Sequence, residues 1–227
     1  MNARPPAGVF IFAGYTRGMP LPNRVDPFGE LFSTPARGTM FGNRGGKFHR
    51  DDRTLGTRRH VTCAWICCRL EFNNRQRQVW GRGYTELFFL DEVTALSAGH
   101  RPCFECRRKD AQAFADFWAR ARKLRTRPRA AEMDVVLHAE RLNDRAKRRH
   151  RVRVDDLPDG AFVALEDGAW AVRGGMLLRW TPSGYDAHKR RPKKIVADVL
   201  TPPAILAVLK AGYRPPWHPS AEKFPSP

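Results

Sequence analysis

At 227 residues, the sequence is long enough for one medium-sized domain or two small ones with a buried core. Hydrophobic residues make up 42% of it, which is ordinary for a globular protein and argues against wholesale disorder. The charge is strongly unbalanced, with 41 Lys and Arg against 23 Asp and Glu and a formal net charge of +18. Because such an excess attracts polyanions, we expect a nucleic acid as the partner.

The distribution of apolar residues excludes two classes of protein. No stretch reaches the roughly 20 apolar residues that cross a bilayer, and residues 9–13 are too few for the core of a signal peptide. We therefore expect a cytoplasmic protein, in which association with the nucleoid is compatible with the charge. The cysteines number five. An odd number in a reducing compartment favours metal ligation over disulfide bonds.

The predicted elements fall into three parts along the chain. Residues 1–58 are rich in Gly, Pro and Arg, which predicts an ordered but irregular arm. Residues 59–128 alternate strand and helix patterns. The elements expected in this second part are, in order, a strand at 61–72, a polar turn at 73–75, a short partner strand at 78–80, a strand at 87–90, a short helix capped by Asp91 and ended by Gly99, and an amphipathic helix closed by Pro128.

The amphipathic helix has the clearest pattern in the sequence. Its opposite face is basic, and its apolar residues recur at steps of three, four or seven. This apolar stripe consists of Phe104, Ala111, Phe114, Trp118 and Ala121.

The third part, residues 129–227, combines short strands with a final helix. Dipeptides of the Asp-Gly and Gly-Gly type at 167–168 and 174–175 are hairpin signals. The elements expected are a strand at 133–138, a basic run at 145–153, strands at 161–165, 169–172 and 176–180, a helix from Pro202 through Ala211 stopped by Gly212, and a Pro-rich tail from Pro215.

Residues 103–106 read C-F-E-C at the mouth of the amphipathic helix. Two thiolates at this spacing suit one metal ion, and a helix N-terminus favours their ionised form. Zinc, which takes about four ligands, is the expected ion. A redox-active cysteine pair is the main alternative, and the upstream cysteines argue against it because they offer further ligands. Buried thiols without a metal are a third interpretation.

The segment around this pair is similar to a known domain. Residues 95–107, A-L-S-A-G-H-R-P-C-F-E-C-R, resemble the second half of the metal-binding domain of Ada-type DNA alkylation-repair regulators, where the pattern runs A-L-A-A-G-F-R-P-C-x-x-C. An aromatic strand precedes the pattern in both. The resemblance extends over about residues 63–109 and is specific over the last dozen.

Two registers compete for the first half of the family pattern, an I-x-C-R-P-x-C segment. Spacing alone matches Cys63 and Cys67, but a straight strand would hold their sulfurs about 13 Å apart. Local similarity instead aligns I-C-C-R at 66–69, which makes Cys68 the first ligand and leaves Phe72 at the place of the second. In either register the chain departs from the family pattern.

The candidate ligands follow from these registers. Neighbouring residues of a strand face opposite sides, so Cys67 and Cys68 share one metal only if the chain kinks between them. We expect a zinc ion held by Cys67, Cys68, Cys103 and Cys106. The alternatives for the fourth position are Cys63, His60 and His100.

In the Ada family, one zinc-bound cysteine accepts a methyl group from a methylated DNA phosphate. The resemblance therefore implies DNA as the partner and a link to DNA repair or regulation. If the activity is retained, Cys68 is the nucleophile. If one ligand is lost, a structural zinc would still support a DNA-binding fold.

Basic clusters mark the expected nucleic-acid surface. One follows the cysteine pair, and others lie at 147–151 and 189–194. The residues expected to bind nucleic acid are Arg69, Arg101, Arg107, Arg108, Lys109, Lys147, Arg148 and Arg149. The tryptophans fall within predicted elements and are expected in the core.

Two other classes of function stay open at this stage. A metal-dependent nuclease would use His49, Asp51 and Asp52, which lie together in a Gly- and Arg-rich stretch. An RNA–protein assembly module would use the basic surface alone. A phosphate-binding P-loop is excluded, because the glycines at 42–46 lack the Lys-Ser/Thr that follows one.

Taken together, these patterns predict an α+β fold. A small zinc-stabilised α/β module, residues 59–128, is expected to pack against a small antiparallel β unit followed by a helix and a Pro-rich tail. The leading function is a zinc-containing protein that binds nucleic acid, with DNA favoured over RNA. The sequence indicates no protein partner, sequence preference or oligomeric state.

Overall fold

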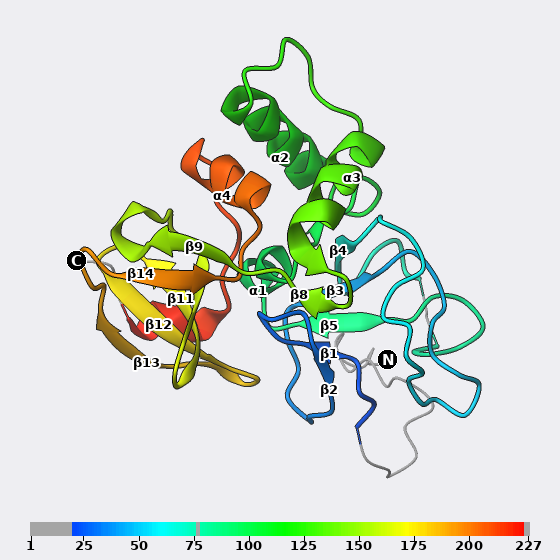
Figure 1. The fold of residues 1–227 in the computed structure, drawn as a ribbon. Coiled ribbons are helices and arrows are strands. Elements are labelled where there is room, and N and C mark those ends of the chain that lie inside the picture. The colour runs from blue at the N-terminus through cyan, green and yellow to red at the C-terminus, as the bar shows by residue number, and fades with distance from the viewer. Residues whose placement is uncertain (1–19, 76–77, 225–227) are drawn as a thin grey trace, which may run out of the picture.

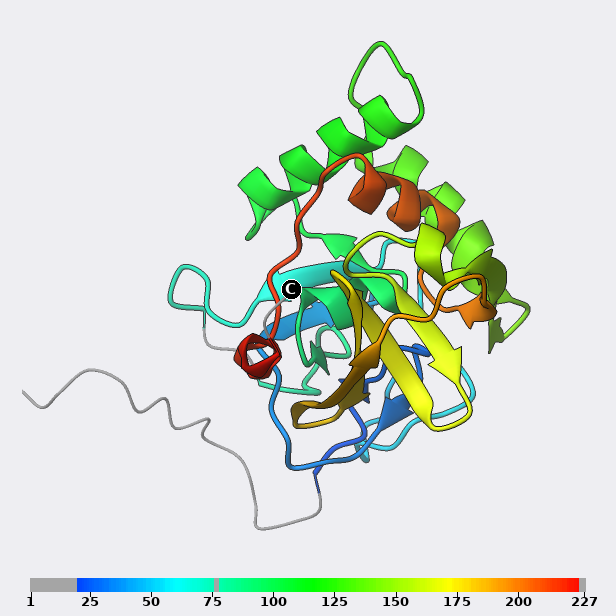
Figure 2. The ribbon, with the colours of Figure 1, turned by 90° about the vertical axis from the view of Figure 1, so that its left-hand side faces the viewer.

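The computed structural model describes residues 20–75 and 78–224, and it has the α+β architecture that the sequence predicts. Two six-stranded sheets lie side by side, and a layer of helices covers one end of both (Figures 1 and 2). The helices are α1 (Glu92–Ser97), α2 (Arg108–Ala121), α3 (Ala130–Arg141) and α4 (Pro203–Lys210). No helix within the described ranges is long and apolar enough to cross a membrane.

The first sheet is mixed and has the order β2-β1-β5-β3-β4-β6. Its pairings β1–β5 and β4–β6 are parallel and the others antiparallel. The strands are β1 (Arg24–Val25), β2 (Leu31–Phe32), β3 (Met40–Asn43), β4 (Ile66–Arg69), β5 (Leu87–Phe89) and β6 (Arg101–Pro102). The strand expected at 61–72 is therefore shortened to β4, and residues 78–80 form a turn rather than a partner strand.

Residues 20–58 do not form the irregular arm that was expected, because they supply three strands of this sheet. Residues 1–19 of the predicted arm lie outside the described residues. The glycines that suggested loops have a packing role instead. A Cβ at Gly42, in the middle of β3, would collide with the carbonyl oxygen of Ile66 and the ring of Phe89. Glycine at this position therefore permits β3 to lie between β4 and β5.

The helix α1 joins the two sheets. Its predicted N-cap is confirmed, since one carboxylate oxygen of Asp91 accepts hydrogen bonds from the backbone N–H and the hydroxyl of Thr94, both at 2.8 Å. The other oxygen accepts from the Tyr185 hydroxyl (2.9 Å) and the His218 backbone N–H (3.0 Å). One buried carboxylate thus links α1 to the second sheet and to the C-terminal segment.

The helices α2, α3 and α4 pack on one another around a shared apolar cluster. The amphipathic helix is confirmed. It begins at Arg108, two residues after the cysteine pair, and ends at Ala121 rather than just before Pro128. The strand predicted at 133–138 is wrong, because this segment belongs to α3. The two valines favoured a strand, but Met133 and Leu137, one turn apart, are the residues that the helix buries.

The second sheet is wholly antiparallel, in the order β13-β12-β11-β10-β14-β9. The three predicted strands are confirmed as β10 (Phe162–Leu165), β11 (Gly168–Arg173) and β12 (Met176–Thr181). Three further strands were not predicted: β9 (His150–Arg153), β13 (Gly184–Arg190) and β14 (Val196–Val199). Exposed and half-buried positions alternate along β9 and along the basic end of β13, and both arginines of β9 are exposed. A two-stranded hairpin, β7 (Leu142–Asn143) and β8 (Ala146–Lys147), connects α3 to β9.

Candidate metal centre

Three cysteines from two segments converge at the end of the first sheet. Cys68 lies on β4, whereas Cys103 and Cys106 lie in the turn between β6 and α2. Their sulfurs are all within 4.8 Å of one another, and all three side chains are buried. This thiolate triad, Cys68, Cys103 and Cys106, is the candidate metal centre.

Backbone hydrogen bonds hold the two segments together. The strands β4 and β6 pair in parallel, and the N–H of Cys103 donates to the carbonyl of Cys67 at 2.9 Å. The N–H of Arg107 donates to the carbonyl of Cys103 (3.0 Å), and the N–H of Glu105 points at the Cys103 sulfur (3.4 Å). An amide aimed at a sulfur stabilises the thiolate form. The turn is therefore shaped to present thiolates before α2 begins.

The three thiols strongly influence one another's ionisation. Hydrogen bonds from Cys106 and Cys68 lower the pKa of Cys103 to about 2, with further help from backbone amides. The pKa of Cys68 is raised because its thiol donates to Cys103 and Cys106 and is buried. The pKa of Cys106 is raised mainly because its thiol donates to Cys103. A divalent cation would replace the shared protons and allow all three sulfurs to ionise.

The donor set fits a soft, tetrahedral metal ion. Thiolates at about 2.3 Å from zinc lie about 3.8 Å apart, so the observed spacing needs only a small contraction. Within the residues that the structure describes, no fourth His, Cys, Asp or Glu joins the triad. The fourth position of a bound metal would therefore be open to water or to a ligand from outside.

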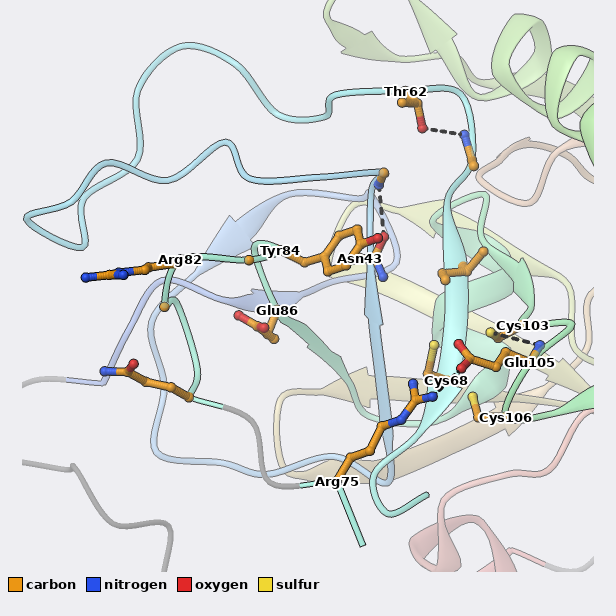
Figure 3. A pocket seen from close by; sticks show the side chains of 16 residues that line it. Asn43, Thr62, Cys68, Arg75, Arg82, Tyr84, Glu86, Cys103, Glu105 and Cys106 are labelled. Carbon is orange, nitrogen blue, oxygen red and sulfur yellow. Dashed lines mark hydrogen bonds and ion pairs between the residues drawn. The ribbon is translucent and has the colours of Figure 1, made fainter. Parts of the chain in front are cut away.

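A cavity of about 680 Å³ opens directly over the triad (Figure 3). Its walls carry charged and aromatic side chains that the sequence patterns did not single out. Arg75 pairs with Glu105 at 2.5 Å beside the sulfurs, and Arg82 is exposed at the rim. Tyr84 lines the same cavity and is 50% exposed.

A buried acidic residue also lines the cavity. Glu86 lines the cavity and is 5% exposed, and its carboxylate accepts a hydrogen bond from the backbone N–H of Trp80 at 2.8 Å. The Trp80 indole N–H donates to the carbonyl of Glu86 at 3.0 Å. These bonds fix the loop at 80–86, which explains how Tyr84 is held over the cavity although its surroundings are rich in glycine.

Cys67, one of the four expected ligands, lies outside the triad. It faces the opposite side of β4, as the alternation of a strand requires, and packs in the core beneath β1 and β5. Its sulfur accepts a long contact of 3.6 Å from Nη1 of Arg107, and burial raises the pKa of its thiol above the usual range. No kink brings it to the metal side.

The alternative ligands are also placed elsewhere. His100 is fully buried, and its Nε2 accepts from Nε of Arg44 at 3.3 Å. His60 packs edge-on against His138, with ring centroids 5.1 Å apart. Cys63 is half-buried and does not belong to the triad. Of the two cysteines considered as the first ligand, Cys68 therefore belongs to the triad and Cys63 does not.

Two basic residues expected on the nucleic-acid surface lie in the core instead. Arg101 is 5% exposed and forms a bidentate ion pair with Asp134 at 2.7 and 2.8 Å. Arg107 is 3% exposed and pairs with Glu92 at 2.7 Å. Both guanidinium groups are buried within these ion pairs, so a phosphate cannot reach them.

The other expected basic residues are accessible to different degrees. Lys147 is half-buried, and its ammonium donates to the carbonyl of Ser97. The remaining five are exposed: Arg69, Arg108, Lys109, Arg148 and Arg149. Arg69 and Arg108 lie one and two residues from a cysteine of the triad, so part of the predicted surface borders the candidate metal centre.

The residues considered for a nuclease do not form a metal site. The His49 ring is stacked on Trp80, with centroids 5.0 Å apart, and its nitrogens bond to Thr85 and to the carbonyl of Gly81. The exposed carboxylates of Asp51 and Asp52 bond to Lys47 and Thr54 instead. Within the described ranges, the thiolate triad is the one group with the geometry of a metal site.

Comparisons with known proteins identified no similar protein. A scan against models of protein families, a search of curated proteins and a search of solved structures each returned no match.

Proposed function

We propose that this protein is a zinc protein that binds nucleic acid, with DNA the favoured form, in the cavity above the thiolate triad. The single observation that supports this proposal is the position of three buried cysteine sulfurs at the floor of an open cavity whose walls carry Arg75, Arg82 and Tyr84. The metal would fix the positions of the cysteines at the floor of the cavity, and the side chains of the walls would bind the nucleic-acid strand.

Zinc is the ion that best suits the donors. Three thiolates select soft or borderline cations over magnesium and calcium, which prefer oxygen ligands. Three sulfur ligands with one open position are typical of zinc sites that also bind a ligand. Cys68, Cys103 and Cys106 would hold the ion. The positive charge of the ion would keep each of the three sulfurs ionised.

The chemistry of the walls supports nucleic acid. Arginine guanidinium groups donate paired hydrogen bonds to phosphate oxygens, and an exposed tyrosine offers a face on which a base can stack. The net charge of +18 adds a long-range attraction for a polyanion. The exposed Arg69 and Arg108 extend the basic surface beyond the cavity.

Binding to a short single-stranded DNA is expected to weaken steeply as salt is raised from about 50 to 200 mM, because counterions are released from the phosphates. Removing the stacking face with Tyr84→Ala is expected to reduce the affinity by about tenfold or more. Arg82→Gln should reduce it and also flatten the slope of affinity against salt, because one phosphate contact is lost. Fluorescence anisotropy of a labelled oligonucleotide measures both quantities.

A matched control is available on α4. Lys210 is exposed at the end of α4, lies outside the basic clusters and does not line the cavity, so Lys210→Gln should leave the affinity almost unchanged. Parallel titrations with RNA of the same sequence assign the preferred nucleic acid. Equal affinities of wild type, Tyr84→Ala and Arg82→Gln for the oligonucleotide would show that the nucleic acid does not bind in the cavity.

A second candidate activity is acceptance of a methyl group, and it is favoured by the open side of the triad. The sulfur of Cys68 would attack the methyl carbon of a methylated phosphate, so that the S–C bond forms as the C–O bond breaks and the phosphodiester leaves as an anion. Each chain would react once. The zinc would keep the sulfur ionised. Arg75 lines the cavity at an exposed position, where a phosphate would replace Glu105 as its partner.

This activity predicts a defined mass change. Incubation of the zinc protein with DNA that carries methylphosphotriesters should add one methyl group, about 14 Da, to Cys68, and peptide mass spectrometry locates it. Unmethylated DNA is the matched substrate control, and it should leave the mass unchanged. A protein that binds the methylated DNA in the cavity but gains no mass would exclude the methyl-accepting reaction and leave the binding function intact.

A further inference from the structure

A second cavity, of about 660 Å³, lies on the other side of the segment 57–66 from the thiolate triad. Successive residues of this segment line different cavities: Thr62 and Ala64 face the first, whereas Val61 and Trp65 face the second. The second cavity contains no cysteine and shares no residue with the first.

Two buried arginines enclose the Trp65 ring at the base of this second cavity. The Cζ atoms of Arg44 and Arg141 each lie 3.9 Å from the centre of the indole ring. The side chains are almost completely buried, with exposed fractions of 1% for Arg44 and 0% for Arg141. Cation–π contact with both guanidinium groups holds them in place.

The charge of these groups is not compensated. In the part of the chain that the structure describes, neither Arg44 nor Arg141 nor Lys147 forms an ion pair. They donate instead to neutral acceptors: Arg44 to the carbonyl of Gly29 at 2.8 Å, and Arg141 to the carbonyl of Gly99 at 2.9 Å. The Nε–H of Arg141 has no hydrogen-bond partner at all.

Burial and mutual repulsion make this arrangement costly. Burial lowers the pKa of Lys147 to about 7, and it lowers the pKa values of both arginines to about 9. The nearby carboxylates do not neutralise these three cations, because Glu30 and Asp144 are exposed at the rim of the cavity. Asp26 lies near enough to oppose the shifts of Arg44 and Lys147 but forms no ion pair with either.

Three cations that converge without a counter-charge are expected where an anion binds, because buried charges are paired in folded proteins. We infer that the second cavity is a binding site for a phosphate group, held by Arg44, Arg141 and Lys147. A phosphate dianion offers acceptor oxygens in several directions, and it matches guanidinium donors better than a single carboxylate does. The exposed Arg58 and Arg145 at the rim would attract it.

This site is independent of the proposed function of the thiolate triad, because it uses different residues in a different cavity. Calorimetric titration of the zinc-loaded protein with inorganic phosphate should show saturable binding of one phosphate per chain. Lys147→Met, which keeps most of the length of the side chain but removes its charge, should weaken binding about tenfold or more. The double variant Arg58→Gln/Arg145→Gln changes exposed residues only and should weaken it without loss of stability.

Matched controls separate this site from the rest of the basic surface. Arg190→Gln on β13 and Lys210→Gln at the end of α4 change exposed residues outside the second cavity and should bind phosphate as the wild type does. Preference for a 5′-phosphorylated oligonucleotide over the same oligonucleotide with a 5′-hydroxyl would assign the phosphate to a nucleic-acid end. Equal binding of the two, with saturable binding of free phosphate, would assign it to a small molecule. The inference is overturned if phosphate binding is not saturable, or if the folded Lys147→Met and rim variants bind it unchanged.

Discussion

Purified protein is expected to contain one zinc ion per chain, and removal of this ion with a strong chelator should lower the Tm by about 10 °C or more. The reason is that the thiolate triad joins β4 to the turn that precedes α2, so a metal there adds a crosslink to the backbone hydrogen bonds and apolar contacts between the two segments. Structural zinc contributes on the order of 10 kcal/mol in small domains, and each kcal/mol shifts the Tm of a chain of this size by about 2–4 °C. Metal analysis and calorimetry measure the two quantities.

The individual cysteines provide the controls for this expectation. Cys68→Ser, Cys103→Ser and Cys106→Ser should each lose most of the bound zinc, because two thiolates and one open side do not retain it. Cys63→Ser should keep the full zinc content, since Cys63 lies outside the triad. Loss of zinc from Cys63→Ser, or a Tm indifferent to the chelator, would contradict the assignment.

The cysteine pair could be predicted from the sequence because its signal is local. A C-x-x-C before an amphipathic helix specifies its own turn, and the structure places Cys103 and Cys106 together as expected. The third member of the triad depends on which face of β4 turns toward that pair. Both faces are buried, one by the core beneath β1 and β5 and the other by the triad, so alternation alone left Cys67 and Cys68 undecided.

The parts of the fold that could not be predicted depend on long-range partners. The strands β1 and β2 have two residues each, too few for a periodic pattern, and they exist because β5 pairs with β1. The helix α3 was predicted as a strand because two valines outweighed the spacing of Met133 and Leu137. The wall residue Tyr84 lies in a glycine-rich loop whose position is set by Glu86 and Trp80, and no sequence pattern reports such a contact.

Arg107 shows how a residue expected at the surface can support the site from below. It was expected to contact nucleic acid because it follows Cys106 in a basic run. Its guanidinium group is instead inserted under the turn, where it bonds to Glu92 of α1 (2.7 Å) and Asp110 of α2 (2.9 Å) and approaches Cys67 of β4. One side chain therefore connects the three elements that surround the triad.

Arg107→Met is accordingly expected to destabilise the protein by about 3–5 kcal/mol at pH 7, because it leaves the buried carboxylate of Glu92 without its counter-charge. Burial already raises the pKa of Glu92, against the opposing effect of Arg107. In the variant this pKa rises further, so the folded state binds a proton more tightly than the unfolded state does. Stability of the variant relative to wild type should therefore recover as the pH falls from 7 toward 5, and decline again as it rises.

The double variant Glu92→Gln/Arg107→Met separates the charge effect from lost packing. With the carboxylate neutralised, the hydroxyl of Tyr213, which donates to Glu92 at 2.9 Å, keeps an amide oxygen as acceptor. Urea denaturation at pH 7 should therefore find the double variant more stable than Arg107→Met alone. The difference in the free energy of unfolding between the double variant and wild type should no longer change between pH 7 and 5. If the single variant were as stable as wild type, or its deficit independent of pH, Glu92 would not depend on Arg107 for its charge.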